Sequence, residues 1–411
     1  MTTIIKSKNI VLGVCGGIAA YKSVELLRLL VKAGAEARVI MTAEAAQFVG
    51  PMTFEALSRR KVVCSLFDPT DDASIQHIRW AQEADAVVVA PATANIIGKL
   101  ANGIADDALT TFMLAVTCPV MICPSMNTNM YANPAVQRNI EMLKNRGNKV
   151  PDPAAGELAC GTCGPGRLPE PAELFDMLGG LLAPKDFRGR NVVVTAGPTR
   201  EAIDPVRFIS NPSSGKMGYA IARAAEMRGA QVILITGPTA LPPPPNVMVI
   251  RVTTAAEMLA AVLDYTAHAD VIIKSAAVAD YRPVAAASQK IKKSDTALTL
   301  TLERTQDILK AVAERKKTQI VVGFAAETQK LDEFATTKLK AKKLDMIVGN
   351  LIGSHDAGFG TDTNRVTFYF PDGTREALDT MPKEDLAHMI LDRIGRLPVA
   401  RPAALAEEER R

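Results

Sequence analysis

Cys160 and Cys163 lie two residues apart in the glycine-rich stretch ELACGTCGPGR, residues 157–167. A CxxC pair can bind zinc, act as a redox dithiol, form a disulfide, or carry one reactive thiol. Zinc needs four ligands, and the chain has no second CxxC and only four histidines, which disfavours a metal site. A redox CxxC normally opens a helix, whereas the glycines and Pro165 predict a loop here. The remaining cysteines lie in or beside apolar runs, where a thiol packs as a small hydrophobe: Cys15, Cys64, Cys118 and Cys123.

Two glycine-containing turns could hold a phosphate, although neither matches a nucleotide motif. GVCGGIA, residues 13–19, lacks the GxGxxG spacing and the acidic residue that a dinucleotide site needs about 20 residues on. NPSSGKMG, residues 211–218, departs from a P-loop, because Ser210 replaces the first glycine and Met217 replaces the Ser or Thr after Lys216. Both turns lead into predicted helices, whose first N–H groups suit an anion, but a simple tight turn explains them equally well.

Several polar side chains have a structural explanation when each is taken alone. His77, in SIQHIRW, is more often a partly buried structural histidine than a base. Lys338 and Lys342 are spaced i, i+4 and share a helix face, which is usually solvated. Helix capping or an Asx turn accounts equally well for three more residues: Thr93, Asn95 and Asn127.

These residues depend on an α/β scaffold that is repeated along the chain. Short β-branched runs alternate with helical patterns, which is typical of parallel sheets. The first series has predicted strands at 9–14, 37–42, 86–92 and 119–125, and its helices end at Gly34 and Gly147. A second series begins at 189–201, with helices near 254–267, 306–317 and 331–343 and a late Asp-Gly hairpin. We predict two doubly wound, Rossmann-like domains, 1–185 and 186–398, followed by a frayed tail, 399–411.

The composition excludes some classes of partner. Hydrophobic residues make up 48% and charged residues 22%, with a net charge of +4 and one Trp, so nothing indicates nucleic-acid binding. The chain has no run of eighteen apolar residues, and its first apolar run is too short for a signal peptide. We therefore expect a cytoplasmic protein without a membrane partner.

Several stretches taken together are more specific than any one of them. GVCGGIAAYK, APATAN, PSMNTNM and ACGTCGPGR resemble the FMN-dependent phosphopantothenoylcysteine decarboxylases of the flavin-containing cysteine decarboxylase family. TAGPTREAIDPVRFISNPSSGKMG, KSAAVADYRP, QKIKK and GFAAET resemble phosphopantothenate–cysteine ligase. Their order resembles the bifunctional bacterial enzymes of coenzyme A biosynthesis, from residue 8 to about 395. The resemblance implies a flavodoxin-like first domain and a nucleotide-binding second domain.

For the first domain, the resemblance implies oxidative decarboxylation of phosphopantothenoylcysteine to 4′-phosphopantetheine with FMN. It implies that His77 is the base, that Asn127 holds the substrate carboxylate beside Met130, and that Cys160 protonates the enethiol left after CO2 departs. Cys163 falls at a variable position of the motif and is expected to be dispensable. The implied FMN contacts are Gly16, Gly17, Ile18, Thr42, Thr93 and Asn95.

For the second domain, the resemblance implies CTP-dependent ligation of 4′-phosphopantothenate with L-cysteine through an acyl-cytidylate, assisted by Mg²⁺. It implies Lys290 as the catalytic lysine, Asn211 and Arg207 as contacts of the substrate and the acyl-cytidylate, and Asp280 as a metal ligand. Gln306 stands where the family has Pro, a departure in the loop before Asp307. The implied CTP contacts are Lys274, Ser275, Ala276, Asp280, Lys290, Gln306, Asp307, Ile308, Leu309, Phe324, Lys338 and Lys342.

The resemblance also implies a homo-oligomer, with trimers of the flavin domain, dimers of the ligase domain, and a dodecamer as the closed arrangement that satisfies both. A non-enzymatic regulatory flavoprotein of the same fold is the alternative, and loss of His77, Asn127 or Cys160 would favour it. All three residues are present. A flavin prenyltransferase or reductase leaves the second domain and Cys160 unexplained.

Overall fold

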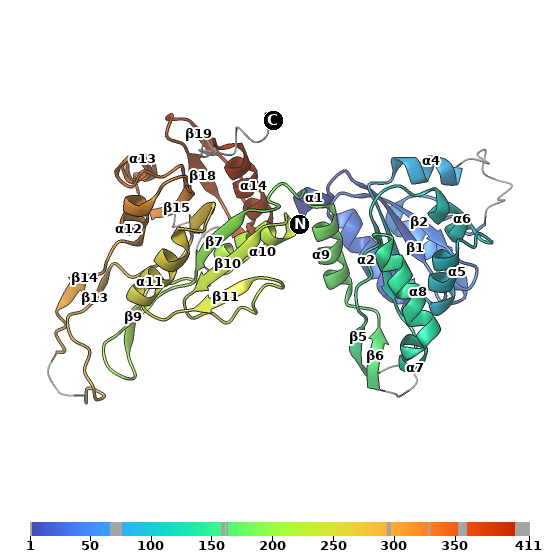
Figure 1. The fold of residues 1–411 in the computed structure, drawn as a ribbon, viewed down its shortest axis with the longest axis horizontal. Helices are drawn as coiled ribbons and strands as arrows, with labels where there is room; N and C mark the ends of the chain where they lie inside the picture. The colour runs from blue at the N-terminus through green and yellow to red at the C-terminus, as the bar shows by residue number, and fades with distance from the viewer. Residues whose placement is uncertain are drawn as a thin grey trace, which may run out of the picture. The chain divides into compact units, whose positions relative to one another are not determined.

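The computed structural model describes residues 2–65, 76–157, 161, 163–293, 297–327, 329–351 and 360–398. The chain divides into two compact units, Met1–Ala183 and Pro184–Arg411, which are described separately (Figure 1). This division lies two residues before the predicted boundary at 185/186.

Unit 1 is built on a parallel sheet with the strand order β2-β1-β3-β4. Val11 is paired with Arg38 of β2 and with Val87 of β3, both in parallel register. Because both faces are covered, the strands are buried along almost their whole length. The strands are β1 (Asn9–Val14), β2 (Glu36–Met41), β3 (Ala86–Ala92) and β4 (Val120–Pro124), with the hairpin β5 (Ala154–Glu157) and β6 (Cys163–Arg167) outside the sheet.

Alternate strand residues of unit 1 enter two separate cores. Ile10 and Leu12 pack against helices α1, α2, α3 and α9, whereas Val11 packs against α4, α5, α6 and α8. This division is the doubly wound arrangement predicted from the sequence. The helices are α1 (Thr2–Ile5), α2 (Ala20–Lys32), α3 (Pro51–Ser58), α4 (Gln76–Glu83), α5 (Ala94–Asn102), α6 (Ala108–Ala115), α7 (Thr128–Ala132), α8 (Pro134–Asn145) and α9 (Pro171–Leu182), with a 3-10 turn at Ala45–Gln47.

Unit 2 contains an eight-stranded sheet with the order β11-β10-β7-β12-β15-β16-β18-β19. Its first six strands are parallel, and β18 and β19 form an antiparallel edge. The Asp372-Gly373 turn of the predicted hairpin joins β18 to β19. The strands are β7 (Asn191–Ala196), β10 (Gln231–Thr236), β11 (Met248–Arg251), β12 (Val271–Lys274), β15 (Ile320–Glu327), β16 (Met346–Leu351), β18 (Val366–Tyr369) and β19 (Arg375–Ala377).

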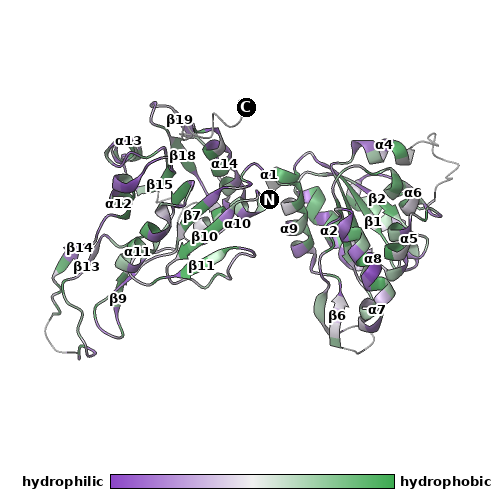
Figure 2. Ribbon diagram, in the orientation of Figure 1, coloured by the Kyte–Doolittle hydropathy of each residue, from purple (hydrophilic) through white to green (hydrophobic). Residues whose placement is uncertain are grey.

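Helices cover both faces of this second sheet as well, and Figure 2 shows the hydrophobic strands inside each unit. One core contains α10 (Lys216–Met227) and α14 (Lys383–Arg396). The opposite core contains α11 (Ala255–Thr266), α12 (Ile308–Arg315) and α13 (Leu331–Ala341). Three short pairs lie outside the sheet: β8 (Arg200–Ala202) with β9 (Phe208–Ser210), β13 (Tyr281–Pro283) with β14 (Leu302–Arg304), and β17 (Thr363–Asn364) with β20 (Met381–Pro382).

The strand orders locate a ligand crevice in each unit. In unit 1 the order reverses between β1 and β3, and in unit 2 it reverses between β7 and β12. Ligands of open α/β sheets bind beyond the carboxyl ends of the strands at such reversals. Both predicted doubly wound domains are thus confirmed, and each has one topologically defined site. None of the described helices has the length and apolar content needed to cross a bilayer.

Candidate active sites

A cavity of about 700 Å³ lies at the carboxyl ends of β1, β3 and β4 in unit 1. This volume is typical of cofactor sites. Its walls come from the turn after β1, the starts of α5 and α7, and the β5–β6 hairpin. The lining residues are Gly16, Gly17, Ile18, Ala19, Tyr21, Lys22, Thr93, Ala94, Ser125, Met126, Asn127, Met130, Glu157, Gly166, Arg167 and Leu168.

The turn after β1 brings backbone close to this cavity. Gly16 has no room for a side chain, because a Cβ there would lie 2.3 Å from Cβ of Glu44. Gly17 and Ile18 lead into α2, which begins at Ala20. The start of this 13-residue helix faces the cavity and can attract an anion with its N–H groups. The three residues predicted to contact the FMN are therefore together at the crevice.

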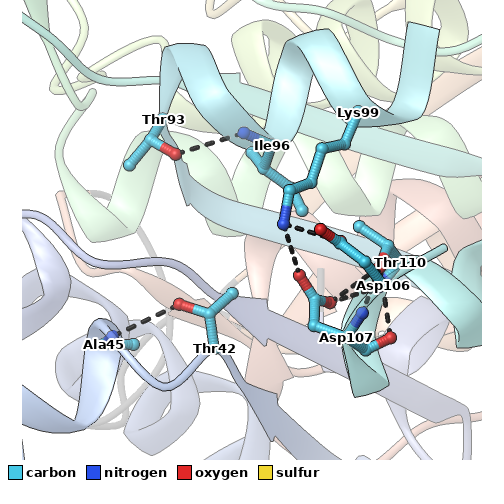
Figure 3. Close-up of polar contacts among 8 residues, drawn as sticks. All are labelled: Thr42, Ala45, Thr93, Ile96, Lys99, Asp106, Asp107 and Thr110. Atoms are coloured by element: carbon cyan, nitrogen blue, oxygen red, sulfur yellow. Dashed lines mark hydrogen bonds and ion pairs between the residues drawn. The ribbon is translucent and has the colours of Figure 1, made fainter. Parts of the chain in front are cut away.

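Three further FMN contacts were predicted, and two of them, Thr42 and Thr93, are drawn in Figure 3. Thr93 lines the cavity and also caps α5, because its Oγ1 accepts a hydrogen bond from Ile96 N at 3.3 Å. Thr42 is buried and accepts a bond from Ala45 N at 3.3 Å. Asn95 is exposed on the first turn of α5. Neither Thr42 nor Asn95 is among the residues that line the cavity, so only Thr93 of this group faces it directly.

Asn127 begins α7 at the end of β4. Its Oδ1 accepts a hydrogen bond from Asn129 N at 2.8 Å, which is the Asx turn considered from the sequence. It also lines the cavity, as does the half-exposed Met130 of the same motif. The structural and the substrate-binding interpretations of Asn127 are compatible, since the residue both caps the helix and lines the cavity.

The strands β5 and β6, which lie directly before and after residues 158–162, pair with each other as a hairpin. Glu157 is paired with Cys163 in the β5–β6 ladder, and Cys163 is exposed. Gly166 holds the base of the hairpin, because its carbonyl accepts a hydrogen bond from Met126 N at 2.9 Å. A Cβ on Gly166 would lie 2.2 Å from the carbonyl oxygen of Met126. Figure 1 shows β6 beside α7, so the hairpin is joined to the loop that carries Asn127.

We predict that Gly166→Ala reduces the decarboxylation that the sequence resemblance implies about 100-fold, because the base of the hairpin must move away from Met126 and misplaced catalytic groups lose rates of this order. The measurement is CO2 release from supplied phosphopantothenoylcysteine. Gly147→Ala is the matched control, because Gly147 also has a positive φ, +89°, but a Cβ there meets no atom within 4 Å. Equal losses in the two variants would contradict the prediction.

Two predicted catalytic residues of unit 1 cannot be placed in this geometry. Cys160 lies outside the described residues. His77 belongs to α4, but its side chain lies outside the described part of the structure.

Lys22 is a residue of this site that sequence reasoning missed. It is buried on α2, lines the cavity, and its Nζ donates to Leu168 O at 2.9 Å and to Glu170 Oε1 at 2.7 Å. These bonds join α2 to the segment that follows the hairpin. The signal in the sequence was a lysine on the apolar face of an amphipathic helix.

The second site contains a group of partly buried lysines at the carboxyl edge of unit 2. Burial, and next the charge of Lys338, lower the pKa of Lys274 at the end of β12 to about 8. Burial, followed by the charge of Lys342, also lowers the pKa of Lys338, whose Nζ donates to Phe324 O at 2.7 Å. Lys342, just beyond α13, forms an ion pair with Asp307 at 2.6 Å. Mutual repulsion between ammonium groups in a partly desolvated place favours a bound polyanion.

A smaller cavity of about 130 Å³ lies beside β15 in unit 2. It brings three predicted nucleotide contacts, Ser275, Ala276 and Phe324, next to the Ser213–Gly218 turn that opens α10. Sequence reasoning missed two wall residues, Asn350 and Lys383. Asn350 lies on β16, the strand beside β15, and Lys383 begins α14, 59 residues after Phe324. Asn350 is 8% exposed, and its Oδ1 has no hydrogen-bond partner among the described residues. Its position at the end of β16 was the available signal.

Arg207 lies in the turn of the β8–β9 hairpin, and Asn211 directly follows β9. Asn211 Nδ2 donates to Val278 O at 3.0 Å, which joins the loop after β9 to the loop after β12. Arg207 forms a bidentate pair with Asp204, with its Nε and Nη2 at 3.0 and 2.6 Å from Oδ2. Lys290 is exposed.

The remaining predicted nucleotide contacts differ in whether their side chains are exposed to a ligand. Asp280 and Gln306 are exposed. Asp307 caps α12 by accepting from Lys310 N at 3.1 Å. Ile308 and Leu309 are each 2% exposed and pack in the core beneath α12. Their side chains cannot reach a ligand, so only their backbone atoms are available for the contact expected from the sequence.

No group of three or more His, Cys, Asp or Glu side chains is placed to hold a metal ion in the described parts of the chain. Asp280 alone does not make a metal site. Among the described residues, a Mg²⁺ ion would therefore need further ligands, and nucleotide phosphates commonly supply them.

The two units match two family models. The Flavoprotein family matches residues 2–183, and the DNA/pantothenate metabolism flavoprotein C-terminal domain matches residues 187–397. The two units are thus those of a flavoprotein domain joined in one chain to a C-terminal domain of the DNA/pantothenate metabolism flavoproteins.

The curated relatives extend over nearly the whole chain. It is 51% identical over 402 residues to the coenzyme A biosynthesis bifunctional protein CoaBC of Bacillus subtilis, covering 96% of this chain and 98% of that protein. CoaBC of Escherichia coli is 45% identical over 395 residues, covering 95% and 97%. The crystal structure of the C-terminal domain of a CoaBC protein is 45% identical, with a TM-score of 0.45, and covers 51% of this chain and 96% of that one. The chain belongs to the CoaBC family of bifunctional coenzyme A biosynthesis proteins.

Proposed function

We propose that the chain carries out two consecutive reactions of coenzyme A biosynthesis. Unit 2 joins 4′-phosphopantothenate to L-cysteine with CTP, and unit 1 decarboxylates the product to 4′-phosphopantetheine. The observation that supports the proposal is that several residues of each motif set lie together at the carboxyl ends of the strands in their unit. Gly16, Thr93 and Asn127 line one cavity, while Ser275 and Phe324 line the other.

The residues of unit 1 fit FMN. The cavity combines apolar walls with a few polar groups, and the start of α2 suits the phosphate. The chemistry that FMN supplies when bound is oxidation of the cysteinyl CH2–SH to a thioaldehyde, which accepts the electron pair released with CO2, and return of two electrons to the resulting enethiol. Asn127 would hold the substrate carboxylate through an amide, which binds it without adding a positive charge that favours its retention. His77 would take a proton from the cysteinyl group, and Cys160 would return one.

Unit 2 would activate a carboxylate, which is a poor electrophile by itself. The carboxylate of phosphopantothenate attacks the α-phosphorus of CTP, pyrophosphate leaves, and an acyl-cytidylate forms. The cysteine amine then attacks the acyl carbon and releases CMP. Negative charge grows on phosphoryl oxygens, so Lys290 and the lysines near β12 would stabilise it, with Mg²⁺ carried by the nucleotide. Arg207 and Asn211 would bind the phosphopantothenate and its acyl-cytidylate.

The test uses the purified full chain and compares CTP with ATP. We expect bound flavin, and pyrophosphate release from CTP that requires phosphopantothenate. Adding cysteine should give phosphopantothenoylcysteine and then CO2. A chain without flavin and without CTP-dependent pyrophosphate would contradict the proposal. Bound flavin without either reaction would support the alternative, a regulatory flavoprotein, and a preference for ATP would overturn the site assigned around Phe324.

The proposal includes self-association of both units. Around the first cavity, Ile18 and Tyr21 are 64% and 57% exposed. In unit 2, Val206, Phe208 and Tyr281 are exposed on or beside the short β8–β9 and β13–β14 pairs. Exposed apolar side chains gathered in this way are typical of subunit contacts. Native mass spectrometry of the full chain tests this, and a monomer would contradict it.

We predict that nucleotide binding weakens as the pH rises through about 8, because Lys274 loses its proton there. Below that pH its ammonium can pair with phosphate, whereas above it KM for CTP should rise by up to about tenfold per pH unit. Phosphate groups are fully ionised well below this range, since their second pKa is about 6. Lys274→Arg should remove the pH dependence because arginine stays protonated. The same slope in the variant and the unmodified chain would exclude Lys274 as the titrating group.

A further inference from the structure

Asp204 is a buried carboxylate that the proposed chemistry does not use. It lies in the turn between β8 and β9, and its side chain is 0% exposed. Its carboxylate accepts five hydrogen bonds, from Val206 N at 2.8 Å, Arg207 N at 2.8 Å, Arg207 Nε at 3.0 Å, Arg207 Nη2 at 2.6 Å and Ile291 N at 3.1 Å. Four of these donors come from the turn itself, and the fifth comes from 87 residues away.

That distant donor belongs to the stretch QKIKK, in which Ile291 directly follows Lys290. Arg207 contacts the same residue from the other side, because its Nη2 also donates to Ile291 O at 2.6 Å. The backbone of Ile291 is therefore held at both its N–H and its carbonyl. A second connection lies slightly upstream, where Ala287 N donates to Ile203 O at 2.9 Å.

The charge of Asp204 is stable in this position. The Arg207 guanidinium and the backbone N–H groups keep the pKa of the Asp204 carboxyl well below its usual range. A buried carboxylate of this kind is strongly bound to its donors, and leaving them without a partner is costly. The network therefore fixes two neighbouring elements at once, namely the Arg207 side chain and the backbone that follows Lys290.

We propose that Asp204 is a positioning residue of the ligase reaction, which holds the Lys290 segment and the Arg207 guanidinium in one network. The proposal rests on the proposed function of unit 2, because it gives Lys290 and Arg207 their roles. Arg207 remains 43% exposed, so its guanidinium is accessible to a substrate while it is bound to Asp204. Substrate binding at Arg207 and the position of Lys290 are then coupled through a residue that contacts neither the substrate nor the nucleotide.

The test is Asp204→Asn in the full chain. An amide of the same shape cannot accept from all five donors, because one of its two terminal atoms is itself a donor. We expect trypsin to cleave after Lys290, Lys292 or Lys293 at least about tenfold faster, the factor expected when a hydrogen bond to a charged group is lost. We also expect kcat for ligation to fall about 10- to 100-fold and KM for phosphopantothenate to rise, with decarboxylation of supplied phosphopantothenoylcysteine unchanged.

Asp186→Asn is the matched control, because it also removes a carboxylate from an arginine of unit 2, in this case the buried Arg228, with Asp186 Oδ1 2.8 Å from Arg228 Nε. It should lower the melting temperature without changing cleavage in the QKIKK stretch. Ile291→Pro is a second variant if Asp204→Asn fails to fold, since it removes the N–H that Asp204 accepts but leaves the pair with Arg207 intact. Because trypsin does not cleave a Lys–Pro bond, this variant should be cleaved faster after Lys292 or Lys293 only, and it should show the same loss of ligation.

Unchanged cleavage in both variants would overturn the proposal, and so would selective cleavage with normal ligation. A rise in cleavage that the Asp186→Asn control shares would also overturn it, because general loss of stability would then be the cause. Failure of the proposed function is distinguishable: the unmodified chain would release no pyrophosphate from CTP, although the cleavage experiment would still report whether Asp204 holds the segment.

Discussion

Cys160→Ser is expected to stop the overall reaction at the enethiol, after CO2 has left, while Cys163→Ser leaves formation of 4′-phosphopantetheine largely intact. The enethiol formed after loss of CO2 needs a proton as well as two electrons, and a serine hydroxyl is a far weaker acid than a thiol. General acids contribute about 10²- to 10⁴-fold, so formation of 4′-phosphopantetheine should fall by that factor. CO2 release in the first turnover should persist, because it precedes the protonation.

Cys163→Ser is a close control, because the two thiols are separated by two residues. Cys163 is exposed, and its pairing with Glu157 in the hairpin is a backbone pairing that serine preserves. Mass spectrometry of the products under anaerobic conditions separates the outcomes. The Cys160→Ser reaction should accumulate the enethiol, and the Cys163→Ser reaction should give the normal product. Equal damage from both substitutions would instead indicate that the cysteines act as a pair.

Lys290→Gln is expected to lower pyrophosphate release by about 10²- to 10³-fold, the usual loss when one donor to a developing oxyanion is removed. The amide keeps a hydrogen-bond donor but lacks the charge that stabilises the phosphoryl oxygens. The rate is measured at saturating CTP and phosphopantothenate. Decarboxylation by unit 1 of the same molecule serves as an internal control, because it should not change.

Lys293→Gln tests whether the position or merely the charge matters. Lys293 is exposed in the same basic run, but only Lys290 is followed directly by the residue that Asp204 and Arg207 hold. We expect Lys293→Gln to stay within about twofold of the unmodified chain, as surface substitutions usually do. A comparable loss in both variants would mean that the run binds phosphate as a general basic surface.

The sequence predicted the main strands of both sheets but missed the short strand pairs outside them. Glycine and β-branched patterns located the main strands to within a few residues, because hydrophobic periodicity is a local property. The same patterns did not predict the β5–β6, β8–β9 and β13–β14 pairs, which have few apolar residues and no short turn motif. The stretch around Cys160 was predicted as a loop for this reason, whereas the residues on either side of it form a ladder.

Some residues of the candidate sites could likewise be predicted from the sequence, and others could not. Thr93, Asn127 and Phe324 could be chosen from motifs, because residue type and spacing are written in the chain. Lys22 and Asn350 were not chosen, because a lysine on an apolar helix face or an asparagine at a strand end is a weak signal, and only the cavities show what each side chain faces.

By itself, the sequence determined the two repeated α/β series, the residues able to bind phosphate or move protons, and the resemblance that joins them. The tertiary structure decided which of these residues meet. Thr42 and Asn95 do not line the first cavity, and Ile308 and Leu309 are in the core. It also joined Asp204 to Ile291 across 87 residues. The physical reason is that strand order, rather than chain order, sets which loops lie side by side, and strand order follows from packing of the whole sheet.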